Sequence, residues 1–202
     1  MPTNEVLWRL SRIYTSIDAT LEDDLGQFPP DVSQAENYFA FFQDFAGGLS
    51  PTEISNLAHS MIHNIVNLRD HLRKWAAKNG HDKALVDKTL SGSLPLQVIT
   101  DLSNNDKHDY PPRNSGFSKK ALKLIDVERV LRLTTRAEPG SGVGMVFTLA
   151  GPKQVSGSGS AAVTITGQVS DRNGNSLGDL YELCAEALEA WERLLRDFRI
   201  VV

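Results

Sequence analysis

The side chains with the clearest chemical potential form one polar run, residues 101–109, which reads DLSNNDKHD. The run places an ammonium next to an imidazole, at Lys107 and His108, one residue after the carboxylate of Asp106. An imidazole can act as a general acid or base near neutral pH, and an ammonium can stabilise developing negative charge. The run is therefore a candidate site for proton transfer on an anionic substrate.

The polar run continues a predicted helix that begins near residue 93 and has an apolar face of Leu94, Val98 and Leu102. At 100° per residue, Asn105 and Asp106 continue this face, and the helix cannot extend through the Pro-Pro pair at 111–112. His108 lies beside the face, where Asn104 or Asp101 can orient it. An alternative interpretation is an ordinary helix C-terminus, in which Lys107 and His108 interact with the helix dipole.

A carboxylate on a buried face needs a cation close by, because an unpaired buried charge costs several kcal/mol. The long helix predicted upstream offers Arg69 and His71, which flank its apolar stripe on opposite sides. We therefore expect Arg69 or His71 to hold Asp106 and His108, provided that the two helices pack antiparallel.

The sequence shows no complete metal site. His59 and His63 stand four residues apart on one helix face, which is a spacing that zinc ligands use, and Asp70 lies near the same side. No full ligand set is visible, and a solvated polar face explains the pair. The single cysteine, Cys184, falls on an apolar stripe and is expected to be inert. We expect no bound metal and no cofactor.

Residues 107–136 are basic, with eight Lys or Arg side chains against three acidic ones. Such a segment can bind a phosphate chain, and its members nearest the polar run are Arg113, Lys119 and Lys120. An ordinary solvated face explains the same residues. The overall pI of about 5.7 argues against packaging of duplex DNA.

The elements that must position these residues follow from the periodicity. Steps of three and four predict helices over residues 4–25, 34–46, 50–79, 82–90, 93–110 and 176–199, and alternation predicts strands over 127–136, 145–150 and 162–170. Short connections make these strands an antiparallel meander. The predicted class is α+β: a helical bundle with a small three-stranded antiparallel sheet inserted before a long C-terminal helix. We expect one domain over 1–202, with a helical part at 1–110, the meander at 121–170 and the last helix returning to the bundle.

The segment 34–46 carries five aromatic residues within eight positions, namely Tyr38, Phe39, Phe41, Phe42 and Phe45. As a helix it would be apolar on several sides, so it would need burial on several sides. It is either central in the bundle or it contacts a second chain, and the second alternative predicts a homodimer.

The composition is that of a globular protein, with 202 residues, 41% hydrophobic and 23% charged. No apolar run is long enough to span a bilayer, and the N-terminal residues do not resemble a secretory signal. With one cysteine and no signal, the expected location is the reducing cytoplasm, without a membrane partner.

The string at 101–108, together with the upstream LRDHL at 68–72, is similar to a signature of uncharacterised bacterial proteins that runs D-L-x-N-x-x-K-H. More remotely it resembles the HEPN helical bundles. That resemblance implies dimers and, in many members, metal-independent RNA cleavage at an R-x(4–6)-H motif. The chain has Asp101, Leu102 and Ser103 at the positions where that motif has its arginine.

Two functional interpretations remain open. In the first, the protein is a HEPN-like nucleic-acid-associated module that binds or cleaves RNA, with His108 as general acid or base. Lys107 and Arg69 would then stabilise phosphate charge, with Asp106 and His71 beside them and Asn104 and Asn105 among the binding residues. In the second, it is a non-catalytic dimeric scaffold or a small-ligand-binding protein, and the polar run is structural.

Overall fold

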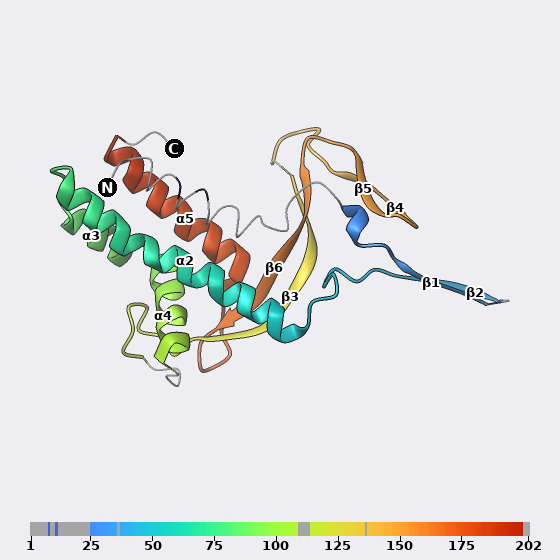
Figure 1. Cartoon of the computed structure of the whole chain (residues 1–202), viewed down its shortest axis with the longest axis horizontal. Helices are drawn as coiled ribbons and strands as arrows, with labels where there is room; N and C mark the ends of the chain where they lie inside the picture. The colour runs from blue at the N-terminus through green and yellow to red at the C-terminus, as the bar shows by residue number, and fades with distance from the viewer. Residues whose placement is uncertain are drawn as a thin grey trace.

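The computed structural model describes Trp8, Ser11 and residues 25–35, 37–108, 114–135 and 137–199. Figure 1 shows the helices gathered at one end of the molecule, the strands beside them, and a hairpin projecting at the far end. The bundle helices are α2 (Pro51–Lys78), α3 (Ala84–Gly92), α4 (Leu94–His108) and α5 (Leu180–Asp197). The predicted α+β class is confirmed. The helix predicted at 4–25 lies almost wholly outside the described residues.

Helix α2 begins and ends where its sequence signals predict. The side chain of Ser50 accepts the backbone N–H of Glu53, and Glu53 in turn accepts the N–H of Ser50, with Pro51 in the first helical position. Asn79 forms the C-cap, and Gly80 follows at a φ of 75°. This reciprocal cap satisfies two of the orphan donors of the first turn, so it fixes the start of the helix.

The core lies between the apolar stripes of α2, α4 and α5, and the inner face of the sheet completes it. Trp191, Met61, Ile62 and Leu72 are among its largest fully buried side chains. Helix α5 begins at Leu180, with Asp179 as its N-cap, later than the predicted start at 176. Leu94, predicted on the buried face, is 50% exposed because it is the first residue of α4.

The predicted sheet of residues 127–136, 145–150 and 162–170 is wrong in its pairing. The three-stranded antiparallel sheet has the order β3 (Lys123–Thr134), β6 (Ser160–Ser170), β7 (Ser176–Asp179), so its last strand leads directly into α5. Strand β4 (Gly144–Thr148) pairs with β5 (Gly151–Ser156) as a hairpin of its own. Segment 151–156 has a glycine, a proline and no alternation of apolar and polar residues, so its sequence does not predict a strand.

The predicted aromatic helix at 34–46 is also wrong. Strands β1 (Asp31–Ala35) and β2 (Tyr38–Phe42) form an antiparallel hairpin, in which Ser33 pairs with Ala40 and caps no helix. Aromatic side chains favour strands, and a strand sends successive side chains to opposite faces. The 3₁₀ turn η1 (Leu25–Gln27) precedes the hairpin, and Figure 1 shows the hairpin reaching away from the bundle.

Candidate functional site

The contact between α2 and α4 places His63 between two side chains of α4. Its Nδ1 lies 2.7 Å from the Oγ of Ser103, and its Nε2 lies 2.7 Å from Oδ2 of Asp106. An ionised carboxylate only accepts hydrogen bonds, so Nε2 carries a proton and donates it to Asp106. In the neutral ring Nδ1 then accepts the hydroxyl proton of Ser103. The two contacts fix both the orientation and the tautomer of this imidazole.

His59 lies one turn earlier on α2 and faces the same carboxylate. Its Nδ1 is 3.3 Å from Oδ1 of Asp106, and the centroids of the two imidazole rings are 6.4 Å apart. The side chains of His59, His63 and Asp106 are 30%, 24% and 38% exposed, so solvent and solutes can reach all three. We call His59, His63, Asp106 and Ser103 the His–Asp cluster.

The partners of Asp106 differ from the predicted ones. Helix α2 holds Asp106, as expected, but through His59 and His63 rather than through Arg69 or His71. The His-x-x-x-His spacing was visible in the sequence, whereas the third member comes from a residue 43 positions away. Asp106 is also more exposed than predicted, because the last turn of α4 extends past the core.

Arg69 belongs to a different ion pair. Its Nε and NH2 donate to Oδ1 of Asp87 on α3, at 3.1 and 2.6 Å, and Arg73 lies 2.9 Å from Oδ2 of the same carboxylate. The hydrogen bond from Arg69 holds the pKa of Asp87 below its usual value. The guanidinium of Arg69 also lies over the ring of Phe117, 5.7 Å from its centroid. Arg69 therefore joins α2 to α3 and is not part of the His–Asp cluster.

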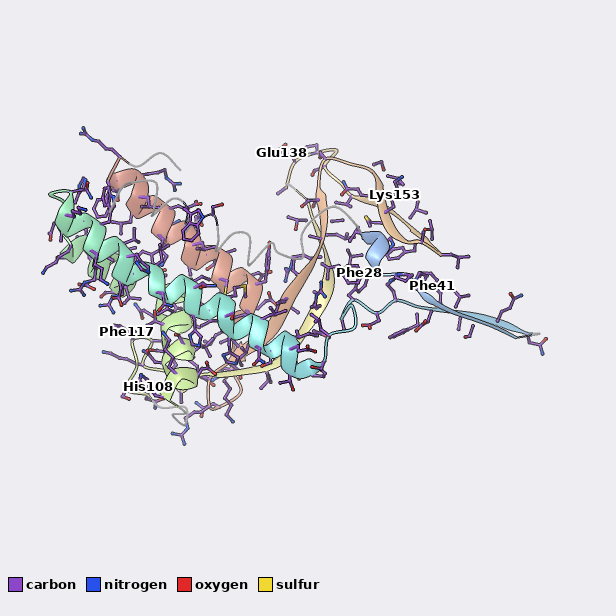
Figure 2. The ribbon with its side chains drawn as sticks, in the orientation of Figure 1. Phe28, Phe41, His108, Phe117, Glu138 and Lys153 are labelled. Atoms are coloured by element: carbon purple, nitrogen blue, oxygen red, sulfur yellow. The ribbon has the colours of Figure 1, made fainter. Side chains whose placement is uncertain are left out.

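The other predicted catalytic residues lie around the end of α4. Lys107 donates from Nζ to Oδ1 of Asn67 at 3.3 Å, so its ammonium reaches α2 one helical turn beyond His63. His108 is the last residue of α4 and is exposed, as Figure 2 shows. His71 is half-buried on α2.

Among the predicted binding residues, Asn104 and Asn105 are half-buried on α4, and Arg113 lies outside the described residues. Lys119 is exposed and Lys120 is half-buried, and both follow a loop that packs on α4. The basic segment is thus attached to the same helix as the His–Asp cluster.

Asp101 is the residue that attaches this loop. Its carboxylate is buried and accepts the backbone N–H groups of Phe117 and Ser118, both at 2.8 Å, and the hydroxyl of Ser118 at 2.6 Å. It therefore has a structural role in place of the predicted orientation of His108. A Cβ added to Gly116 would overlap the Asp101 carboxylate, so the loop can approach only through a glycine. Figure 2 shows Phe117 beside α4 in this loop.

The cluster combines two partly exposed imidazoles and a shared carboxylate, and the ammonium of Lys107 lies one turn further along α2, which is a set suited to proton transfer next to an anion. Within the described parts of the chain, no three His, Cys, Asp or Glu side chains are arranged to hold a metal ion. None of the described helices is both long enough and apolar enough to cross a membrane.

No protein-family model, no curated protein and no solved structure matches this chain.

Proposed function

We propose that the protein is a HEPN-like RNA-associated module that binds RNA beside α4 and cleaves it without a metal ion. The observation that carries the proposal is the pair of partly exposed imidazoles, His59 and His63, that face one carboxylate, with the ammonium of Lys107 one turn away on Asn67. The proposal keeps Lys107 and Asp106 from the sequence-based site. It moves the proton transfers from His108 to the two histidines of α2.

The chemistry needs one proton acceptor and one proton donor. His59 takes the proton of a ribose 2′-hydroxyl, the 2′-oxygen attacks phosphorus, and the bond to the 5′-oxygen breaks. The protonated imidazole of His63 donates Nε2–H to Asp106 in this structure, so it exchanges that acceptor for the leaving oxygen and gives the oxygen this proton, which yields a cyclic 2′,3′-phosphate and a free 5′-hydroxyl. Lys107 stabilises the negative charge that builds up on the phosphoryl oxygens.

The geometry of His59 supports its role as the proton acceptor. His59 uses Nδ1 toward Asp106, so Nε2 is its nitrogen for substrate. Asp106 and Ser103 are positioning residues, since they act by holding the imidazoles.

RNA would be held by the basic residues near α4. Lys119 and Lys120 follow directly on Ser118, which Asp101 holds against the helix. Asp101 and Asp106 are five residues apart, or about 7.5 Å along the helix axis. Because these contacts would be to phosphates, binding should weaken as salt rises.

The test is cleavage of a single-stranded RNA in the presence of a chelator. His59→Ala and His63→Ala should each lower the rate at least ~100-fold, whereas His108→Ala should not. Lys107→Ala is compared with Lys78→Ala, which removes an exposed lysine from the other end of α2. A 2′-O-methyl RNA should bind and stay intact. No cleavage above the protein-free rate, or loss only in His108→Ala, would contradict the proposed chemistry.

A second candidate function, a non-catalytic dimeric scaffold, is favoured by a different observation. The hairpins β1–β2 and β4–β5 leave large apolar side chains open to solvent, Phe42 at 64% and Leu149 at 74% exposure. Exposed apolar surface of this kind marks association sites. We expect a homodimer in solution, and sedimentation equilibrium at micromolar concentration tests it. A mass of 22.2 kDa, that of one chain, would contradict the dimer.

A further inference from the structure

The apolar surface of the strand region spans two hairpins. We call residues 31–42, the hairpin β1–β2, the arm, and residues 144–156, the hairpin β4–β5, the second hairpin. Both leave bulky apolar side chains at least 39% exposed: Val32, Phe41, Phe42, Phe147, Leu149 and Val155. A soluble monomer usually covers such side chains or spaces them apart.

One aromatic contact joins the two hairpins into a single surface. The rings of Phe41 and Phe147 meet edge to face, with centroids 6.1 Å apart. Val32 is the register partner of Phe41, so it extends the same face of the arm. Figure 2 shows Phe41 on the arm and Lys153 on the neighbouring second hairpin.

The arm also lacks the support that a hairpin needs. In the described part of the chain it is a two-stranded sheet with one unpaired edge on each strand, and the second hairpin is another. A lone two-stranded hairpin is at best marginally stable in water, and open edges readily pair with further strands. Both features call for a partner that covers apolar faces and strand edges together.

The charge pattern indicates what that partner is. The arm, residues 31–42, contains two acidic side chains, Asp31 and Glu36, and no Lys or Arg. Residues 139–170 contain one charged side chain, and it is basic: Lys153. An acidic aromatic arm and an apolar, weakly basic hairpin are complementary, and every copy of the chain carries both.

A dimer with a two-fold axis covers both surfaces at once, because each arm can then lie on the second hairpin of the other copy. We infer that the partner is a second copy of this chain, with each arm lying over the second hairpin of the other copy while Phe41 keeps its contact with Phe147 of its own chain; we call this arrangement the arm exchange. This inference rests on the proposed dimer and assigns its interface.

The test is sedimentation velocity of the full chain and of variants over a range of concentrations. Val32→Glu and Leu149→Glu should each weaken dimerisation at least about tenfold, since each places a charge in an apolar contact. The controls are Leu57→Glu and Leu94→Glu, which change leucines that are 42% and 50% exposed on α2 and α4. Unchanged helical circular dichroism shows that each variant remains folded.

The outcomes separate the interface from the dimer itself. A dimer that the two hairpin variants weaken and the two controls leave intact supports the arm exchange. A dimer that withstands Val32→Glu and Leu149→Glu overturns the exchange and leaves dimerisation standing. A chain that sediments at 22.2 kDa at every concentration overturns both, and neither result depends on the RNA assay.

Discussion

The Nε2 atom of His63 lies 2.7 Å from Oδ2 of Asp106, and this contact ties the middle of α2 to the last turn of α4. Both side chains are partly exposed, so water competes with the contact and limits its contribution to stability. The pair is therefore better suited to orienting an imidazole than to holding two helices together.

The first prediction concerns this pair. In a double-mutant cycle of His63→Ala and Asp106→Ala, we expect a coupling free energy of about 0.2–1 kcal/mol, the range of exposed ion pairs. Urea unfolding of the four proteins measures it. If Asp106→Ala alone costs more than about 2 kcal/mol, the cluster is mainly structural and the proposed catalytic role loses its physical basis.

The second prediction concerns the loop that Asp101 holds. Asp101→Ala leaves the partly buried N–H groups of Phe117 and Ser118 and the hydroxyl of Ser118 without their acceptor, so we expect the free energy of unfolding to fall by about 2 kcal/mol. Gly116→Ala should also destabilise, because its Cβ meets the Asp101 carboxylate. Gly92→Ala is the matched control, since nothing lies near the added Cβ there. Equal stability of both glycine variants would contradict the close approach.

The third prediction is a pH dependence that comes from Asp87. The hydrogen bond from Arg69, helped by the charges of Arg69 and Arg73, lowers the pKa of this carboxyl below its ordinary 3.8. Its contribution to stability is therefore complete above pH 3.8 and is lost as the pH falls through the lower pKa of the folded state. Asp87→Asn should reduce the loss of stability in that acidic window.

Urea unfolding between neutral pH and the acid limit of folding checks this dependence. The control is Asp70→Asn, an exposed carboxylate on α2, which should leave the acid limb of the stability curve unchanged. An Asp87→Asn curve parallel to that of the natural chain would show that the Arg69 contact is not maintained in solution.

The fourth prediction concerns Cys184, which lies wholly inside the bundle on α5. Burial raises the pKa of its thiol far above the usual value, and the thiolate is the reactive form. We expect no reaction with a thiol reagent while the protein is folded and one thiol per chain in denaturant. Rapid stoichiometric labelling of the folded protein would indicate that α5 opens readily.

The sequence by itself determined the bundle helices α2 to α5 and their inward faces. The start of α2 is predicted by its capping residues, Ser50, Pro51 and Glu53. The 3.6-residue period of its apolar positions predicts which side of the helix is buried. The same holds for the stripe of α5. These features are local: a cap involves residues three apart, and a helix face repeats every turn, so neighbouring residues contain the information.

Only the tertiary structure decided which elements pair. The aromatic residues at 38–42 satisfy a helix or a strand equally well in a short window, and the hairpin follows from pairing with residues 31–35. The strands at 127–136 and 145–150 look like neighbours in sequence, yet β3 pairs with β6. Strand pairing depends on contacts across many residues, which periodicity does not encode.

The candidate site divides in the same way. The sequence singled out Asp106 and Lys107 on one helix, and it showed the His59 and His63 spacing on another. Their meeting depends on how α2 crosses α4, and the same packing turns Arg69 toward Asp87. Residue types and helix faces depend on the local sequence, whereas the rotation of one helix against another depends on the packing of the whole core. That rotation determines which side chains contact the carboxylate of Asp106.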